Sequence, residues 1–247
     1  MTQTEAVEQT LEKLGGIATL GQLNKETFAI KECEWKTKTP FASIRRIVQQ
    51  DKNIYKIKPG LYALVSYKKE LESLGYLVET EKNKDSDELK TFNHAYYQGL
   101  LLSIGNMKNM QTFVPNQDKN KLFSRQTLGE LRTLQKIPLF SFDTFIQRIS
   151  TVDVIWFNNR NMPDSLFEVE HSTDIQNSLL KFNDLQDFYT RMFIVADEHR
   201  HEEFNRKIGY SSFDNLSKTG RVQFLNYDSL EKQYAQELQK QSLPVIL

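Results

Sequence analysis

The chain has 247 residues, of which 39% are hydrophobic and 26% charged, so it is long enough for one large domain or two smaller ones. Its 32 basic and 32 acidic residues give a formal net charge of zero, which argues against a protein that coats nucleic acid without selectivity. The single cysteine excludes an internal disulfide and a cysteine-based zinc site, and no apolar run is long enough for a membrane span, so we expect a cytoplasmic protein.

Positive charge is concentrated in the N-terminal third of the chain. Between Lys31 and Lys69 there are ten Lys and Arg residues against three acids. The hydrophobic pattern predicts helices over residues 6–14, 20–30 and 40–50, followed by a hairpin over 54–64 that turns at a Pro-Gly pair. Because three helices and a two-stranded wing make a winged helix, we expect a winged-helix DNA-binding domain over residues 1–68.

The last of these helices has a strong start signal, with Thr39 as N-cap and Pro40 at the first helical position. We expect its apolar stripe, which includes Phe41, to face inward. In a winged helix the third helix usually enters the major groove and the lysines of the wing reach phosphates. Such residues can equally form a solvated face, and winged helices also bind proteins. The candidate DNA contacts are Lys36, Lys38, Thr39, Ser43, Arg45, Arg46, Lys56 and Lys58.

Three strings in this region, GGIATLGQL, WKTKTPFASIRRIVQ and YKIKPGLYAL, occur together over roughly residues 3–66. They resemble the HARE-type helix-turn-helix, a winged helix found in restriction endonucleases and chromatin proteins. The resemblance implies contact with DNA and a role in sensing modified DNA.

A connector over residues 69–91 separates this region from a second module, because residues 79–90 are charged and almost without apolar residues. Residues 92–247 predict helices over 92–104, 174–189, 197–208 and 229–241 and strands over 111–114, 150–157, 166–171, 192–196 and 222–227. The order helix, three strands, helix, strand predicts an αβββαβ core with a mixed central sheet.

The segment FEVEHSTD, residues 167–174, carries two glutamates one position apart in a strand-like run. Side chains alternate along a strand, so Glu168 and Glu170 share one face and repel each other unless water or a cation intervenes. The pair therefore indicates either a solvated sheet edge or half of a metal site. Asp153 lies within VDVIW on the preceding predicted strand, and we expect the strand ends that meet at the intervening turn to bring it close to Glu168.

An Asp followed, after a variable gap, by Glu-x-Lys on adjacent strands is the signature of the PD-(D/E)xK nuclease superfamily. Here the pattern is D…ExE, with Glu170 at the lysine position, a replacement also found in some type II restriction endonucleases. The resemblance implies Mg²⁺, with Mn²⁺ able to substitute, held by Asp153, Glu168 and the Val169 carbonyl. Hard divalent cations prefer such oxygen ligands. Glu170 would then orient or deprotonate the attacking water.

The missing lysine leaves several assignments open. Lys181, on the following helix, is either a lysine that has moved into the site or a surface residue that contacts phosphate. His94 and Gln98, one helical turn apart, either support the site or pack in the core. His199 and His201 lie two apart on a predicted helix, so their side chains point to different faces and a joint metal site is not expected. His171 is expected either to be structural or to reach DNA at a strand end.

The whole sequence predicts an Mg²⁺-dependent endonuclease of the type II restriction class that acts on double-stranded DNA. Because a double-strand cut needs two such sites, we expect a homodimer. A catalytically inert reader of modified DNA is the alternative, favoured by the missing lysine. Base-excision chemistry without metal is a third possibility.

Overall fold

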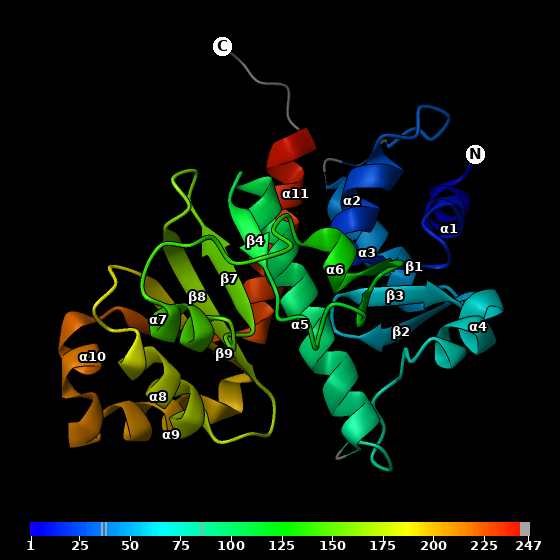
Figure 1. Cartoon of the computed structure of the whole chain (residues 1–247). Coiled ribbons are helices and arrows are strands. Elements are labelled where there is room, and N and C mark those ends of the chain that lie inside the picture. The colour runs from blue at the N-terminus through cyan, green and yellow to red at the C-terminus, as the bar shows by residue number, and fades with distance from the viewer. Residues whose placement is uncertain (36, 38, 85, 243–247) are drawn as a thin grey trace. The chain divides into compact units, whose positions relative to one another are not determined.

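The computed structural model describes residues 1–35, 37, 39–84 and 86–242 (Figure 1). The chain forms two compact units. The first comprises Met1–Phe92 and the last helix from Gln233 onward, and the second comprises Asn93–Lys232. The predicted connector therefore groups with the first unit, and the C-terminal segment returns to it rather than staying with residues 92–232.

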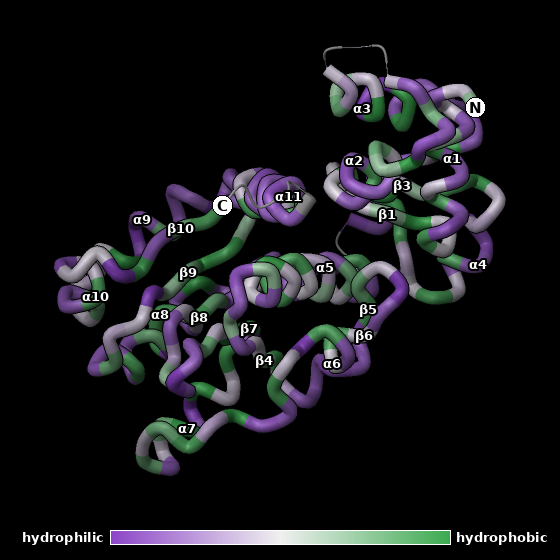
Figure 2. The backbone as a smooth tube through the Cα atoms, turned by 90° about the horizontal axis from the view of Figure 1, so that it is seen from above, coloured by the Kyte–Doolittle hydropathy of each residue, from purple (hydrophilic) through white to green (hydrophobic). Residues whose placement is uncertain are grey.

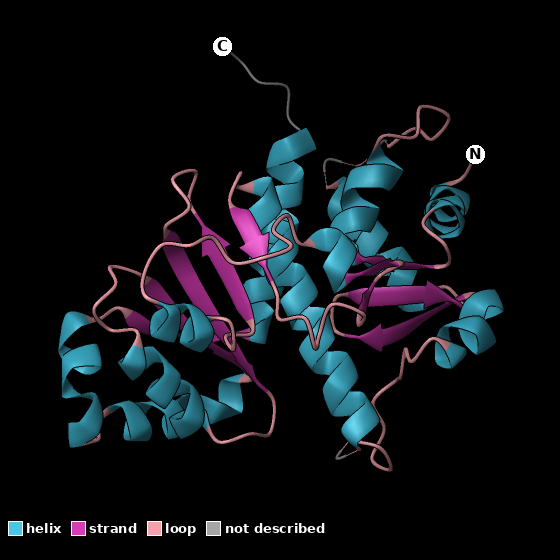
Figure 3. Cartoon of the chain, in the orientation of Figure 1, coloured by secondary structure: helices cyan, strands magenta, loops and turns pink. Residues whose placement is uncertain are grey.

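The first unit contains the predicted helices and hairpin (Figure 3). Strand β1 was not predicted; it pairs antiparallel with β3, which also pairs antiparallel with β2, so the sheet order is β1-β3-β2. Gly60 has φ 77°, which the tight Pro-Gly turn between β2 and β3 requires. The elements are α1 (Gln3–Lys13), β1 (Ile17–Thr19), α2 (Leu20–Phe28), α3 (Pro40–Gln50), β2 (Ile54–Lys58), β3 (Leu61–Leu64), η1 (Val65–Tyr67) and α4 (Lys68–Ser73).

The core of the first unit lies between these helices and the sheet, and α3 contributes Ile44 and Val48 to it. The inward orientation predicted for Phe41 is wrong, because this residue is 39% exposed in the first turn of α3 and its ring lies 6.0 Å from that of Phe28. Thr39 occupies the N-cap position as predicted, but within the described part of the chain its side chain makes no capping hydrogen bond.

Close packing explains why the C-terminal helix, α11 (Tyr227–Ser242), ends in the first unit. A Cβ atom added to Gly21 of α2 would lie 3.1 Å from the Cα of Ala235 and 3.0 Å from Leu238 Cδ1. The two backbones therefore approach closely at the position of Gly21, which has no side chain to keep them apart.

The second unit has the predicted order of helix, three strands, helix and strand, and its sheet is mixed. The strand order is β10-β9-β8-β7-β4; β4, β7 and β8 pair antiparallel, whereas β8, β9 and β10 pair parallel. Its elements are α5 (Asp87–Met107), β4 (Gln111–Phe113), β5 (Leu122–Phe123), β6 (Gln126–Thr127), α6 (Leu128–Leu131), α7 (Asp143–Ile149), β7 (Val154–Phe157), β8 (Pro163–Glu170), α8 (Ile175–Asp184), β9 (Arg191–Ala196), η2 (Glu198–Arg200), α9 (His201–Ile208), η3 (Ser211–Phe213), α10 (Asp214–Thr219), β10 (Val222–Asn226) and the start of α11.

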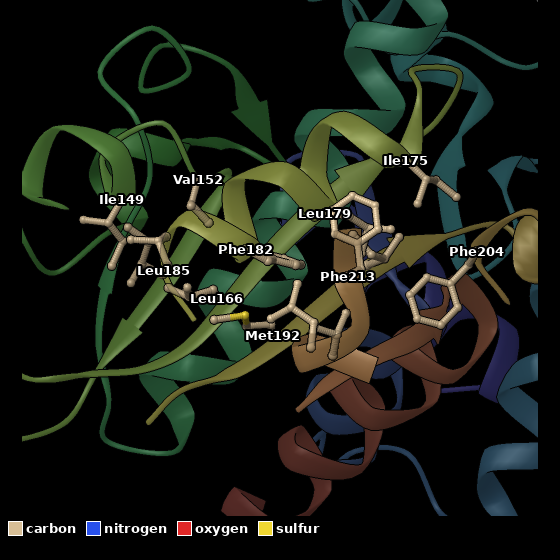
Figure 4. Close-up of a cluster of buried hydrophobic side chains, with 14 of the residues drawn as sticks. Ile149, Val152, Leu166, Ile175, Leu179, Phe182, Leu185, Met192, Phe204 and Phe213 are labelled. Carbon is tan, nitrogen blue, oxygen red and sulfur yellow. The ribbon is translucent and has the colours of Figure 1, made fainter. Parts of the chain in front are cut away.

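Helices cover both faces of this sheet, with α8 on one side and α5 on the other (Figure 2). On the α8 side, Leu179 and Phe182 join Leu166 of β8 and Met192 of β9 in one buried cluster (Figure 4). On the α5 side, the indole nitrogen of Trp156 donates a 3.1 Å hydrogen bond to the carbonyl of Leu101. The sheet is therefore the middle layer, and α8 lies directly over the strand that carries the FEVE segment.

Several predicted boundaries differ from the structure. Strand β7 begins at Val154 rather than at residue 150, so Asp153 directly precedes the strand instead of lying in its middle. Helix α5 begins at Asp87, inside the predicted connector, because acidic residues in a first turn interact favourably with the helix dipole. Within the described residues, no helix has the length and apolar character needed to cross a membrane.

Candidate active site

The pairing of β7 with β8 places Asp153 beside Glu168. Val154 is opposite Phe167 in this antiparallel ladder, so the next residues on each strand, Asp153 and Glu168, lie at the same end. The expectation that they meet at the connecting turn was wrong, because that turn joins Phe157 to Pro163 at the other end of the ladder. The two acids are brought together by strand register.

Glu168 and Glu170 share the face of β8 that α8 covers, since both carboxylates lie within hydrogen-bonding reach of the Ser178 hydroxyl. They are only 2% and 4% exposed. Strand β8 lies between β7 and β9, so the interpretation of FEVE as a solvated sheet edge is wrong. Two carboxylates in such a buried place need compensation from donors or cations.

Asp153 is held in place by donors from two elements. Its Oδ2 atom accepts the Val169 N–H at 2.8 Å and lies 3.1 Å from His94 Nε2. Burial alone would raise the pKa of Asp153, but the hydrogen bond and charge of His94 and the Val169 N–H hold it below its ordinary value. Gln98 Nε2 donates to the Asp153 carbonyl at 3.2 Å and to the buried Asp118 at 3.0 Å. His94 and Gln98 therefore both contact Asp153, whereas Asp118 was not recognised from the sequence.

Glu168 is paired with Lys181. The Lys181 ammonium lies 2.8 Å from Oε2 and 3.0 Å from Oε1 of Glu168, and it also donates to the Thr151 carbonyl at 3.1 Å. Burial and repulsion from Asp153 raise the pKa of Glu168 well above its ordinary value, and Lys181 counteracts part of this rise. The ammonium thus lies against the site, with its side chain 24% exposed.

Glu170 is surrounded by donors that the sequence analysis did not identify. The Ser178 hydroxyl contacts its Oε1 and the Thr173 hydroxyl contacts its Oε2. Burial raises the pKa of Glu170, and these two hydroxyls oppose the rise. Arg200, which is 7% exposed, donates to the Thr173 carbonyl at 2.6 Å and so ties the loop after β8 to the start of α9.

The carboxylates of Asp153 and Glu168 offer oxygen ligands of the kind that a divalent cation prefers. Among the described residues, no group of three or more His, Cys, Asp or Glu side chains is arranged to hold a metal ion by itself. Mg²⁺, however, is commonly bound through one or two carboxylates, waters and substrate phosphates rather than by a complete protein cage. Asp153 and Glu168 supply two such carboxylates at one end of a strand pair, and both are largely buried. These residues therefore fit a divalent cation. The carbonyl of Val169 was the expected third ligand, and the contact observed for this residue is the hydrogen bond from its N–H to Asp153.

The other histidines have separate partners. His199 Nδ1 lies 2.6 Å from Asp197, whereas His201 Nδ1 lies 3.4 Å from Glu198 and its ring stacks on Phe224. The two rings therefore contact different carboxylates. His171 directly follows β8 and lies outside the contacts of Asp153 and Glu168 described above.

The candidate DNA contacts in the first unit divide into four groups. Thr39, Ser43 and Arg46 line a depression of about 560 Å³ at the start of α3, together with Gln3, Thr37 and Ala42. Arg45 and Lys56 are exposed, but Lys58 is only 7% exposed, contrary to expectation. A register shift between Lys56 and Lys58 interrupts the alternation of β2, so Ile57 and Lys58 are both buried. Lys36 and Lys38 lie outside the described residues.

Comparison with known proteins gives two matches. Residues 76–245 match the family described as the type II restriction enzyme NmeDI C-terminal domain. The chain is also 27% identical over 152 residues to the type II restriction enzyme NmeDI of Neisseria meningitidis serogroup C, covering 58% of this chain and 42% of that protein. The matched region thus spans less than half the length of this relative. No solved structure shows significant similarity to the chain.

Proposed function

The chain belongs to the family of the type II restriction enzyme NmeDI C-terminal domain, and on that premise we propose that it is a metal-dependent endonuclease that hydrolyses phosphodiester bonds in duplex DNA. The observation that supports this proposal most strongly is the pairing of β7 with β8, which sets Asp153 and Glu168 side by side. Both acids lie within the part of the chain that matches the family, as do His94, Glu170 and Lys181.

In this proposal Asp153 and Glu168 hold Mg²⁺, or Mn²⁺ in its place, as in the PD-(D/E)xK superfamily that the D…ExE pattern resembles. When bound, the cation supplies Lewis-acid stabilisation for the negative charge that develops on the scissile phosphate. His94 and the Val169 N–H fix the orientation of Asp153 through its Oδ2 atom. Glu170 orients the attacking water or accepts its proton.

Lys181 takes the part of the lysine that is missing from the ExE strand. Its ammonium reaches the site from α8 instead of β8 and contacts both oxygens of Glu168. This position lets it favour the ionised form of Glu168 and lets it pair with a phosphate oxygen as DNA enters. In this proposal Lys181 supplies the positively charged side chain, although Glu170 stands at the lysine position of β8.

The first unit would bind the DNA. We assign it to the HARE-type winged helices, with Ser43, Arg45 and Arg46 of α3 in the major groove and Lys56 on the hairpin near phosphates. These residues precede the part of the chain that matches the family. A homodimer would place two nuclease sites on the two strands.

The test is a digest of plasmid and genomic DNAs that differ in methylation, with Mg²⁺, Mn²⁺ or EDTA, followed by sequencing of the ends. We expect cleavage in either metal and none in EDTA. DNA binding that survives EDTA, with no cleavage in any metal or methylation state, supports the inert reader instead, which the Glu170 substitution favours. Abasic products formed in EDTA indicate base-excision chemistry.

A further inference from the structure

One face of α8 meets the carboxylates of the FEVE segment through a serine and a lysine. Ser178 and Lys181 are three residues apart, so they lie side by side on the helix surface. Building on the proposed endonuclease function, we infer that Ser178 is a positioning residue, which holds Glu168 and Glu170 at the spacing that a divalent cation and the attacking water require.

The contacts of Ser178 are unusual for a helical serine. Its side chain is buried, with the residue 1% exposed, and its hydroxyl lies 3.0 Å from Glu168 Oε2 and in contact with Glu170 Oε1. A hydroxyl has one proton to donate. The Ser178 hydroxyl is placed to donate to both glutamates, so its one proton is shared between Glu168 Oε2 and Glu170 Oε1 in a three-centre hydrogen bond. The serine therefore links the two carboxylates directly.

Thr173 supplies a second hydroxyl to Glu170. Its hydroxyl contacts Oε2, so each oxygen of Glu170 has its own hydroxyl partner. The Thr173 carbonyl in turn accepts from Arg200, whose guanidinium is held by Glu203 through contacts of 2.8 Å and 3.0 Å. The loop that presents Thr173 is thereby tied to the α9 region, which fixes the direction from which this hydroxyl approaches.

This arrangement explains how the strand accommodates a glutamate at the lysine position of the superfamily pattern. Glu170 is 4% exposed, and a buried carboxylate is costly unless donors satisfy it. Neutral hydroxyls satisfy the carboxylate without cancelling its charge, whereas a lysine or arginine partner would cancel it. Ser178 touches both glutamates, so it affects cation binding through Glu168 and the chemical step through Glu170; Thr173 affects only Glu170.

The experiment compares Ser178→Ala, Ser178→Thr, Thr173→Val and Ser103→Ala in the full chain. Ser103 is a matched control, because its hydroxyl is partly buried on a helix and donates to the Gly99 carbonyl of the same helix, at 2.8 Å. Mn²⁺ affinity is measured by calorimetry without DNA, and kcat and KM are measured on cleaved DNA. Loss of a residue that orients ligands typically costs about 10–100-fold in metal affinity or activity.

We expect Ser178→Ala to weaken Mn²⁺ binding about tenfold or more and to lower kcat with KM for DNA unchanged. Ser178→Thr restores both values because it keeps the hydroxyl, and Ser103→Ala matches wild type. Thr173→Val lowers kcat but leaves Mn²⁺ affinity unchanged, and since Thr173 is exposed this variant tests the hydroxyl pair even where Ser178→Ala does not fold.

Wild-type Mn²⁺ affinity in Ser178→Ala, with only the unfolding temperature lowered, overturns the inference. So does a wild-type chain that binds no Mn²⁺, or a Thr173→Val variant with full kcat. A wild-type chain that binds Mn²⁺, loses this binding in Ser178→Ala and yet cuts no DNA of any methylation state supports the positioning role while refuting the proposed endonuclease function.

Discussion

Replacing Lys181 by methionine removes the cation from Glu168 while keeping an unbranched side chain of similar length. The pair is short, at 2.8 Å and 3.0 Å, and the carboxylate is 2% exposed. A hydrogen bond to a charged group contributes about 1.5–3 kcal/mol. Removing one partner of a buried ion pair typically costs about 3–5 kcal/mol when the other partner stays charged. The loss here is smaller, because Glu168 can take up a proton and become neutral. We therefore expect a loss of about 2–3 kcal/mol near neutral pH.

The loss depends on pH in a definite direction. Burial and repulsion from Asp153 already raise the pKa of Glu168 above 4.5, and Lys181 limits that rise. Below the ordinary pKa, Glu168 is protonated in the folded and unfolded chains, so the variant loses little. As the pH rises through the folded pKa of the wild type, the wild-type carboxyl ionises against its lysine whereas the variant keeps its proton. The deficit of Lys181→Met is therefore small at pH 5 and grows toward pH 8.

Thermal unfolding of both proteins at pH 5 and pH 8 measures this difference. With roughly 2–4 °C per kcal/mol for a domain of this size, we expect the midpoint to fall by roughly 4–12 °C at pH 8. Lys181→Arg is the matched control, because it keeps the positive charge and should retain most of the stability. An equal shift at both pH values, or an arginine variant as unstable as the methionine variant, would refute the ion pair as the source of the effect.

Three further predictions follow from other parts of the structure. Gly99→Ala places a Cβ 2.1 Å from the ring of Phe123 and should cost about 1–3 kcal/mol in thermal unfolding. Gly209→Ala, whose Cβ meets its nearest neighbour at 3.4 Å, should be neutral or stabilising by about 0.4–1 kcal/mol; equal losses in the two variants would show that the contact with Phe123 is not the cause. Lys56→Ala should weaken binding to all duplexes and reduce the slope of log affinity against log salt by about 1, and an unchanged slope would remove Lys56 from the phosphate contacts. His94→Gln should flatten the pH dependence of stability above pH 6.5. Burial lowers the pKa of His94, but the hydrogen bond and charge of Asp153 outweigh burial and raise this pKa. The wild type therefore loses stability as the pH rises through the raised pKa, and the variant does not. A variant with the wild-type pH profile between pH 6 and 9 would contradict this assignment.

The parts of the fold that follow from local pattern were predictable. Alternation along β8 placed Glu168 and Glu170 on one face, and the order of buried apolar runs predicted the helix, strands and helix around them. The proximity of Asp153 to Glu168 was also predicted, although for the wrong reason. The hydrophobic pattern of each strand does not determine the register in which β7 pairs with β8, and this register brings the two acids together.

The partners of the carboxylates could not be predicted from spacing. Ser178, Thr173 and Asp118 are ordinary polar residues in the sequence, and only the packing of α8 and α5 on the sheet brings them to the acids. The sequence motifs do not predict these contacts. Each contact depends either on segments that are distant in the chain or on the conformation of a loop. The burial of Lys58 depends in the same way on a bulge that alternation cannot anticipate.

In the proposed function, Asp153 and Glu168 are the metal-binding acids of a DNA endonuclease. Cleavage of supercoiled plasmid in Mg²⁺ by the wild type and by Asp153→Asn, with DNA binding measured on the same samples, tests it most directly. We expect the wild type to cut the plasmid, whereas the asparagine variant, which has nearly the same shape, binds the DNA without cutting it. A variant that cuts at the wild-type rate, or a wild type that leaves plasmids of every methylation state intact, would contradict it.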